Sequence, residues 1–282
     1  MNVAAVGEKG SKAGLLRPQA VALPATVRSA WALINGFFEW FGELGFFSWQ
    51  VLRAAVTPPF EFRELGRQLD EIGSKSLPLV ALAGAAIGAV LSLETRDSLV
   101  RFGAKSLLPA AVVFSIIHET GPIITGLVVC GRAGAGIGAE LGSMKVTEQI
   151  DAMEASAVNP YRLLAATRIL ACILVLPLLT LVADFCGVIM GWVADTLAAP
   201  ISFQQFIHSG FSNFGFNDLL PPTFKTVAFG LIIGMVACFQ GMRTQGGTEG
   251  VGRSATSSVV LSSLFVILAD VILVKLIVVF FP

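Results

Sequence analysis

The sequence predicts an all-α integral membrane protein, with amphipathic helices at the membrane surface followed by five transmembrane helices. Of its 282 residues, 55% are hydrophobic and only 13% are charged, whereas soluble domains carry about 25% charged residues. The apolar residues are also gathered into long runs, and runs of about 18 or more predict transmembrane helices. The formal net charge is zero, which gives no indication of nucleic-acid binding.

The N-terminal segment 1–25 is mixed and polar, and we expect a flexible cytoplasmic tail. It has no short apolar core followed by a small-residue cleavage site, so no signal peptide is predicted. Segment 26–56 is rich in Trp and Phe, which suit the membrane–water boundary. Glu39 and Glu43 argue against the alternative of a first transmembrane span, because both would lie in hydrocarbon. We therefore predict an interfacial helix here.

A second amphipathic surface helix is predicted over 60–75, after the break at Pro58-Pro59, so that 26–75 forms an interfacial region. The membrane-spanning domain is expected over 76–282, with five spans: 77–93, 107–131, 169–192, 223–240 and 259–281. Lys and Arg are concentrated in the N-terminal region and in the loops after the second and fourth spans. Because such loops stay in the cytoplasm, we expect a cytoplasmic N-terminus and a periplasmic C-terminus.

Three motifs typical of enzymes and nucleotide-binding proteins are incomplete. His118-Glu119 begins like a zinc-protease helix, but Pro122 stands where the second histidine is required. The glycines from Gly134 follow an apolar span and not a short strand, which excludes a dinucleotide fold. The chain has no Gly-Lys pair and therefore no Walker A loop, and its four cysteines lack metal or disulfide spacing. We predict no enzyme activity, no metal site and no cofactor in this chain.

The loop after the second span, 140–160, is the most informative part of the chain. Before it, Gly134, Gly138 and Gly142 are four residues apart and form a stripe that lets another helix approach closely. The loop itself contains a short amphipathic helix with acidic residues early, where the helix dipole favours them. This helix either covers the end of the bundle or acts as a coupling helix that binds a partner.

This region carries a family resemblance. The string GRAGAGIGAELGSMKVTEQIDAMEASAVNPYRLL, residues 131–164, resembles the signature of the MlaE/YrbE permeases, which are ABC transporter subunits that work with MCE-domain proteins. The string GVGRSAT at 250–256 and the order of the elements are also similar to that family. The resemblance covers the chain from about residue 60 to its C-terminus.

The resemblance implies a homodimer in the bacterial inner membrane that moves phospholipid or a related lipid to or from a periplasmic MCE-domain carrier. Separate cytoplasmic ATPase subunits would bind ATP and Mg, which agrees with the missing Walker motif. They would dock on the coupling helix, through Thr147, Glu148, Gln149, Ile150, Asp151, Met153 and Glu154. The exact lipid and the direction of transport stay open.

Charged residues inside spans are costly and by default functional. Five lie within the predicted spans: Glu119, Asp184, Lys225, Asp270 and Lys275. The resemblance implies that Glu119, Lys225 and Asp270 are polar positions near the lipid cavity. We expect Glu119 and Lys225 to approach each other, although counting along the spans places Lys225 nearer the outer end. The alternative is that Glu119 is protonated or bonded to backbone freed by Pro122.

Two rival functions compete with this hypothesis. The first is a secondary transporter or proton-coupled channel, with Glu119, Asp184 and Asp270 as a relay; it would be expected to show inverted repeats, which the sequence lacks. The second is a membrane-embedded lipid enzyme, which would need paired catalytic groups, but His118 and His208 are far apart in the sequence.

Overall fold

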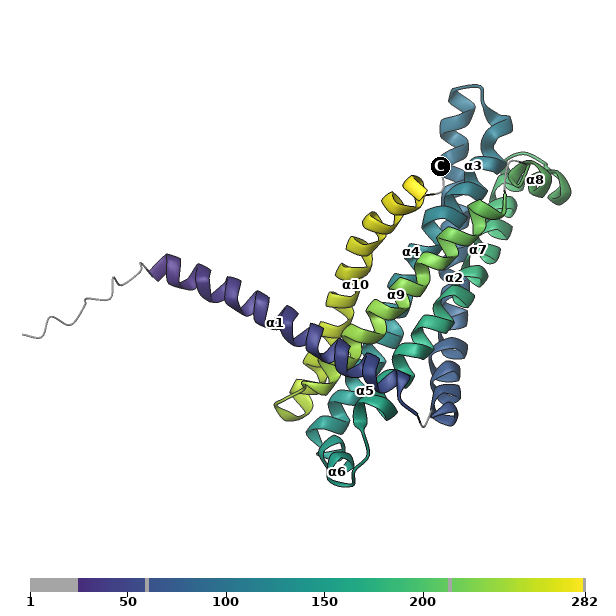
Figure 1. Cartoon of the computed structure of the whole chain (residues 1–282). Coiled ribbons are helices and arrows are strands. Elements are labelled where there is room, and N and C mark those ends of the chain that lie inside the picture. Colours follow the sequence, from purple (N-terminus) through teal and green to yellow (C-terminus); the bar gives the residue numbers. More distant parts are fainter. Residues whose placement is uncertain (1–24, 59–60, 213–214, 281–282) are drawn as a thin grey trace, which may run out of the picture. The chain divides into compact units, whose positions relative to one another are not determined.

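The computed structural model describes residues 25–58, 61–212 and 215–280, and every secondary-structure element in these ranges is a helix. The chain divides into two units, residues 1–43 and 44–282. The second unit contains a bundle of long helices (Figure 1). The predicted all-α class is thereby confirmed. The predicted N-terminal tail lies almost entirely outside the described residues.

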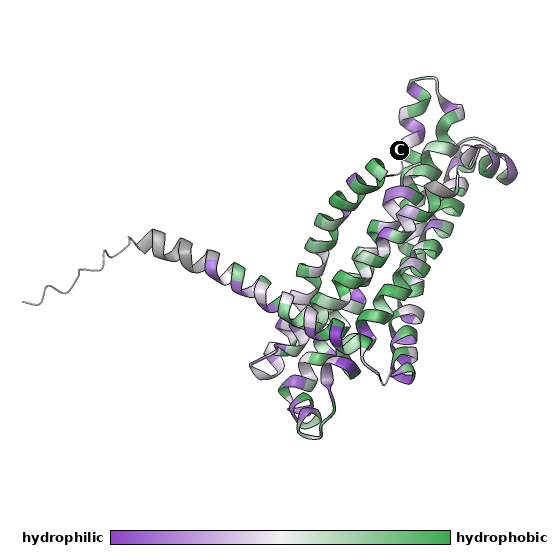
Figure 2. Ribbon diagram, in the orientation of Figure 1, coloured by the Kyte–Doolittle hydropathy of each residue, from purple (hydrophilic) through white to green (hydrophobic). Residues whose placement is uncertain are grey.

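Within the described residues, five helical segments are long and apolar enough to cross a membrane, as predicted. Hydrophobic residues run along α7 (Thr167–Ala198), α9 (Phe216–Met242) and α10 (Gly247–Phe280) (Figure 2). The five segments are Phe62–Arg101, Lys105–Val146, Tyr161–Ala198, Leu219–Met242 and Gly247–Phe280. Each is longer than its predicted apolar run, because the helices continue into polar sequence at their ends.

The first span, α2 (Phe62–Arg101), corrects one prediction. The separate surface helix expected over 60–75 is the first part of α2, so the predicted boundary after Lys75 falls inside one continuous helix. Pro78 removes one backbone donor but does not break the helix. With 40 residues, α2 is about 60 Å long, twice the hydrocarbon thickness of about 30 Å. Its charged first turns therefore extend beyond the apolar layer.

Glycines on α2 and α9 bring these helices against α7. A Cβ at Gly84 would lie 2.9 Å from Ala183 Cα, and a Cβ at Gly88 would overlap the backbone of Gly187. On α9, a Cβ at Gly234 would lie 2.8 Å from Ile169 Cα. These approaches are closer than real Cβ contacts allow, so α7 is the central helix against which two spans pack backbone to backbone.

The second span is divided into short segments. It contains α3 (Leu108–Ser115), a π-helical turn η2 (Ile116–Thr120), α4 (Gly121–Val129), a second π-helical turn η3 (Cys130–Gly134) and α5 (Ala135–Val146). The glycine stripe continues along α5. A Cβ at Gly138 would overlap Ser258 Oγ of α10, one at Gly142 would lie 2.8 Å from Thr244 Oγ1, and one at Gly134 would lie 3.8 Å from Ile233. The stripe thus lies against α9 and α10.

The helix predicted over 26–56 is α1 (Ala25–Val56). It is not among the five candidate spans of the described chain, and its place at the membrane interface stays a prediction. Its last part belongs to the second unit, where Phe47 and Val51 are buried.

At the end of the bundle where α7 finishes, the loop after α7 contains α8 (Phe203–Gly210), whose Phe206 is fully buried. Arg96 of α2 forms an ion pair there with Asp195 of α7. Arg96 lies in the last turns of α2, and this largely buried pair neutralises its charge within the protein.

Candidate functional site

Three charged residues from three different spans meet inside the bundle. Lys225 Nζ of α9 lies 2.8 Å from Glu119 Oε2 of η2 and 2.9 Å from Asp270 Oδ1 of α10. The Lys225 and Asp270 side chains are 1% and 6% exposed, whereas the Glu119 side chain is 46% exposed. We call these three residues the intramembrane charge cluster. The predicted approach of Glu119 to Lys225 is confirmed.

The local sequence around Glu119 explains how it reaches Lys225. Pro122 has no backbone N–H, so the regular bonding pattern is interrupted just after Glu119. The chain widens into the π-helical turn η2, and the Gly121 N–H donates to the Ile116 carbonyl five residues earlier. Such widened turns occur frequently at functional sites. Here the turn carries Glu119 on the side of the helix that contacts α9.

Counting along the predicted spans places Lys225 nearer the outer end of the membrane than Glu119. This difference in depth is wrong, because α9 starts earlier than predicted. The helix begins at Phe216, so Lys225 lies nine residues, or about 13.5 Å, from its start. Asp270 lies ten residues, or about 15 Å, before the end of α10 at Phe280. Glu119 is about 18 Å from Leu107. The three residues therefore lie at similar depths measured from the same end of the bundle.

The other two charged residues of the spans are outside this cluster. Lys275 is exposed on α10. Asp184 of α7 is 5% exposed, and its carboxyl group lies against Gly121, where any Cβ would overlap it. Neither Asp184 oxygen has a hydrogen-bond partner in the described part of the structure. Asp184 thus faces the turn that follows Glu119, and it does not form an ion pair with Lys225.

An apolar cavity of about 390 Å³ borders the cluster, between the start of α9 and the end of α10. Lys225 is the one charged residue among those that line it. The other lining residues are all apolar: Leu220, Pro221, Phe224, Leu273, Leu276, Ile277 and Phe280. An apolar cavity with a single cation at its inner end suits a ligand with a hydrocarbon part and an anionic part.

The predicted coupling helix is α6 (Gln149–Ala155), at the opposite end of the bundle. Ile150 is 2% exposed and anchors α6, while Met153 is partly buried. Lys145 Nζ of α5 lies 2.6 Å from Asp151 Oδ1 and fixes the start of α6. The remaining predicted coupling residues are exposed: Thr147, Glu148, Gln149 and Glu154. The acidic face of α6 therefore points away from the bundle, as a docking surface requires.

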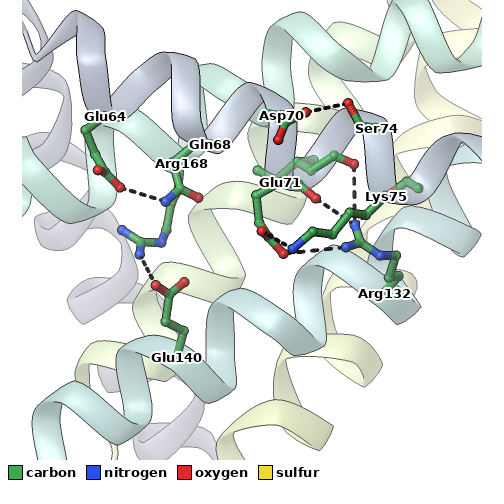
Figure 3. A network of polar contacts seen from close by, with 11 residues as sticks. Glu64, Gln68, Asp70, Glu71, Ser74, Lys75, Arg132, Glu140 and Arg168 are labelled. Carbon is green, nitrogen blue, oxygen red and sulfur yellow. Dashed lines mark hydrogen bonds and ion pairs between the residues drawn. The ribbon is translucent and has the colours of Figure 1, made fainter.

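A polar network that the sequence did not reveal lies near this end (Figure 3). Arg132 of η3 donates to the Glu71 carbonyl at 2.9 Å and to Ser76 Oγ at 2.9 Å, which joins the second span to α2. Arg168 Nη2 of α7 lies 2.9 Å from Glu140 Oε1 of α5, and Arg168 is 1% exposed. Arg132 lies within the motif at 131–164 and Arg168 lies four residues after it, and this position was the available sequence signal of a structural role.

The geometry agrees with the comparisons with known proteins. The MlaE permease family matches residues 65–276, which include all five spans up to the last turn of α10. The chain belongs to the MlaE permease family.

Similar proteins cover most of the chain. A probable ABC transporter permease of Rickettsia typhi is 34% identical over 85% of this chain and 93% of its own length. A probable ABC transporter permease of Synechocystis is 30% identical over 82% of this chain and 89% of its own length. The chloroplastic protein TRIGALACTOSYLDIACYLGLYCEROL 1 of Arabidopsis thaliana is 30% identical over 79% of this chain and 64% of its own length.

This MlaE-family chain is therefore a multi-pass membrane permease, a transport subunit and not an enzyme. An ABC transporter permease works with an ATPase partner. The docking of that partner on α6 stays a prediction, and the structure shows Glu148, Asp151 and Glu154 exposed there.

Proposed function

We propose that this permease moves phospholipid, or a related lipid, between the bacterial inner membrane and a periplasmic MCE-domain carrier. Its ATPase partner supplies the energy by binding ATP and Mg on the cytoplasmic side. The observation that carries the proposal is the apolar cavity between α9 and α10 with Lys225 at its inner end. A phospholipid has the matching chemistry, because its acyl chains suit the apolar walls and its phosphate suits the lysine.

The name of one relative supports a lipid substrate. The Arabidopsis protein is named after trigalactosyldiacylglycerol, which is a lipid with two acyl chains. The chain covers 64% of that relative's length and leaves a part of the relative unmatched.

The half-exposed side chain of Glu119 supports a homodimer. Glu119 is about 18 Å into the membrane by its position along the span, and 46% of its side chain is exposed on one copy. A charged group facing hydrocarbon costs about 2.5–3.5 kcal/mol at the membrane centre. A second copy that faces the charge cluster would remove this cost by enclosing a polar cavity for the lipid headgroup. The span on α10 is only 11% buried in one copy, which leaves surface for that contact.

Proton-coupled transport by Glu119, Asp184 and Asp270 is the rival proposal. Asp184 lies against Gly121 with no hydrogen-bond partner among the described residues, so it does not continue a bonded chain from the cluster. Membership of an ABC permease family favours ATP as the energy source.

The test is lipid transfer by the reconstituted complex. The permease, its ATPase and its MCE-domain protein are placed in liposomes with labelled phospholipid, and transfer to or from the MCE-domain protein is measured with and without ATP. We expect ATP-dependent transfer that Lys225→Met lowers at least tenfold. Lys275→Met is the matched control, since Lys275 is exposed on α10 and outside the cluster. Phospholipid transfer that does not depend on ATP, or an equal loss of transfer in the Lys225→Met and Lys275→Met variants, would refute the proposal.

A further inference from the structure

A polar cavity of about 330 Å³ lies between the start of α2 and the second span. Its walls are the first turns of α2 on one side, and η3 with the start of α5 on the other. It is distinct from the apolar cavity, which is lined by α9 and α10. The lining residues that matter for its chemistry are Arg67, Gln68, Glu71, Arg132, Gly136 and Glu140.

The lining carries charges of both signs. Among the described residues that line the cavity, Arg67 and Arg132 are cations, and Glu71 and Glu140 are carboxylates. Binding sites present charges complementary to those of their ligands. Because the two signs balance here, the lining suits a ligand that carries one charge of each sign.

Two arginines fix the positions of the two carboxylates. Arg132 donates to the Glu71 carbonyl and to Ser76 Oγ, both at 2.9 Å, and its Nη2 lies 3.6 Å from Glu71 Oε1 (Figure 3). The buried Arg168 lies 2.9 Å from Glu140 Oε1. A carboxylate has about four lone-pair sites, so each of these glutamates can accept further hydrogen bonds. Their side chains are 49% and 44% exposed.

Arg67 is the lining cation that can change its partner. Its side chain is 73% exposed, and its ion pair with Glu64, three residues earlier on α2, measures 3.7 Å. Exposed ion pairs of this kind contribute little. A phosphate group binds an arginine through two parallel N–H bonds, so a phosphate in the cavity would replace Glu64 as the partner of Arg67.

The membrane-facing end of the cavity lies at the depth of phospholipid headgroups. Arg132 directly follows the apolar run 107–131 of the second span. Ile72, another lining residue, lies five residues, or about 7.5 Å, before the apolar run of α2, which begins at Leu77. The headgroup layer on each side of a bilayer is about 5–7 Å thick. Both walls of the cavity therefore change from apolar to polar sequence within about the depth of this layer.

An exposed apolar face of α2 leads from the cavity into the membrane. Leu79 follows Gln68 by eleven residues, which make about three helical turns, so both lie on one face of α2. Leu82 has the same relation to Glu71. Leu79 and Leu82 are 48% and 69% exposed. Eleven residues rise about 16.5 Å, which is similar to one leaflet of about 15 Å, so this face suits the acyl chains of a lipid.

From this combination we propose that the polar cavity binds the headgroup of a phospholipid with a primary ammonium group, such as phosphatidylethanolamine. The phosphate binds Arg67, the ammonium group donates to Glu71 and Glu140, and the acyl chains lie along Leu79 and Leu82. The quaternary ammonium of phosphatidylcholine has no N–H to donate, so the site distinguishes the two headgroups. This lipid site is separate from the proposed transport cavity and does not depend on which lipid is transported.

A side chain placed in the cavity tests the site without changing a charge. A Cβ at Gly136, which lines the cavity, meets nothing within 4 Å. The full-length permease is placed in phosphatidylcholine nanodiscs with increasing phosphatidylethanolamine and extracted gently, and the retained phosphatidylethanolamine is counted by mass spectrometry. We expect Gly136→Phe to lower retention about tenfold or more, because its ring occupies the space of the headgroup. Gly131→Phe is the matched control, since Gly131 is also exposed in open space but is outside the lining.

A charge variant tests the same site independently. A cation near the membrane surface contributes about fivefold in affinity for a lipid phosphate. We therefore expect Arg67→Gln to weaken phosphatidylethanolamine retention about fivefold, whereas Arg63→Gln, an exposed arginine one turn earlier on α2, should leave it unchanged. Because Arg67 is 73% exposed, this variant keeps the test valid if Gly136→Phe does not fold.

Four results would overturn the proposal. The first is equal retention of phosphatidylethanolamine by Gly136→Phe and Gly131→Phe. The second is retention of phosphatidylcholine or phosphatidylglycerol by the unaltered protein as tight as that of phosphatidylethanolamine. The third is complete displacement of the lipid by soluble phosphoethanolamine, which would make the cavity a site for a soluble ligand. The fourth is loss of the ATPase from Gly136→Phe with unchanged lipid retention, which would make the cavity a protein contact.

Discussion

Removing Lys225 leaves Asp270 buried without its cation, and we predict a large loss of stability. Lys225 and Asp270 are 1% and 6% exposed and lie 2.9 Å apart. Removing one partner of a buried pair costs about 3–5 kcal/mol. We expect about 3 kcal/mol, the lower end of this range, for Lys225→Met. Asp270→Asn should cost a similar amount, because the lysine then keeps only the half-exposed Glu119.

The double variant distinguishes this reasoning from simple loss of packing. Lys225→Met with Asp270→Asn removes both charges, and a buried ion pair replaced by neutral groups is often close to neutral in stability. We therefore expect the double variant to be no less stable than either single variant, which gives a coupling energy of at least about 3 kcal/mol. The assay is reversible unfolding in mixed micelles, followed by circular dichroism.

Glu119, the half-exposed member of the intramembrane charge cluster, provides a comparison for the stability losses expected at Lys225 and Asp270. Glu119→Gln should cost less than Asp270→Asn in the same assay, because Lys225 then keeps its buried partner Asp270. Its effect should instead be on transport, where Glu119→Gln and Lys225→Met act as one unit. Additive losses of stability for Lys225 and Asp270 would refute the reasoning, since additivity means that the two residues are not coupled.

Three further predictions follow from other parts of the structure. Glu148→Lys with Asp151→Lys should reduce copurification of the ATPase while the permease stays in the membrane; unchanged recovery would contradict the assignment of α6. Gly88→Val should lower stability by about 3 kcal/mol or more, because its side chain would overlap the α7 backbone, whereas Gly66→Ala, in open space on α2, should not lower the melting temperature. Ala157→Gly should stabilise the loop by up to about 1 kcal/mol, because Ala157 has φ 60°, where glycine is unstrained; an equal or lower melting temperature would count against this.

Much of the architecture followed from the sequence. Each of the five apolar runs, as far as the structure describes it, lies within one candidate span, because burial in hydrocarbon requires a helix that bonds its own backbone. The glycine stripe predicted a close helix contact, since only small residues allow it. The long motif at 131–164 was sufficient to indicate the MlaE family, which the family match confirms.

The prediction of a separate helix over 60–75 was wrong because a charged segment and an apolar segment were taken as two elements. Pro78 marked no boundary, since the packing of α2 on α7 through Gly84 and Gly88 holds the helix together. The depth of Lys225 was also misjudged, because α9 extends beyond its apolar run to Phe216. Both errors concern where a helix begins or ends, because the hydropathy of the sequence reports only the part of each helix that faces hydrocarbon.

By itself, the sequence determined that this protein is a helical membrane permease, how many spans it has and which family it belongs to. Only the tertiary structure decided that Asp270 joins the expected Glu119–Lys225 pair, with Lys225 Nζ 2.9 Å from Asp270 Oδ1, whereas Asp184 faces Gly121. It also decided that Arg168 is buried against Glu140 and that Arg67 lines the same cavity as Glu140. The reason is physical: composition and periodicity record the environment of each segment, whereas a contact between segments depends on how the helices pack against one another.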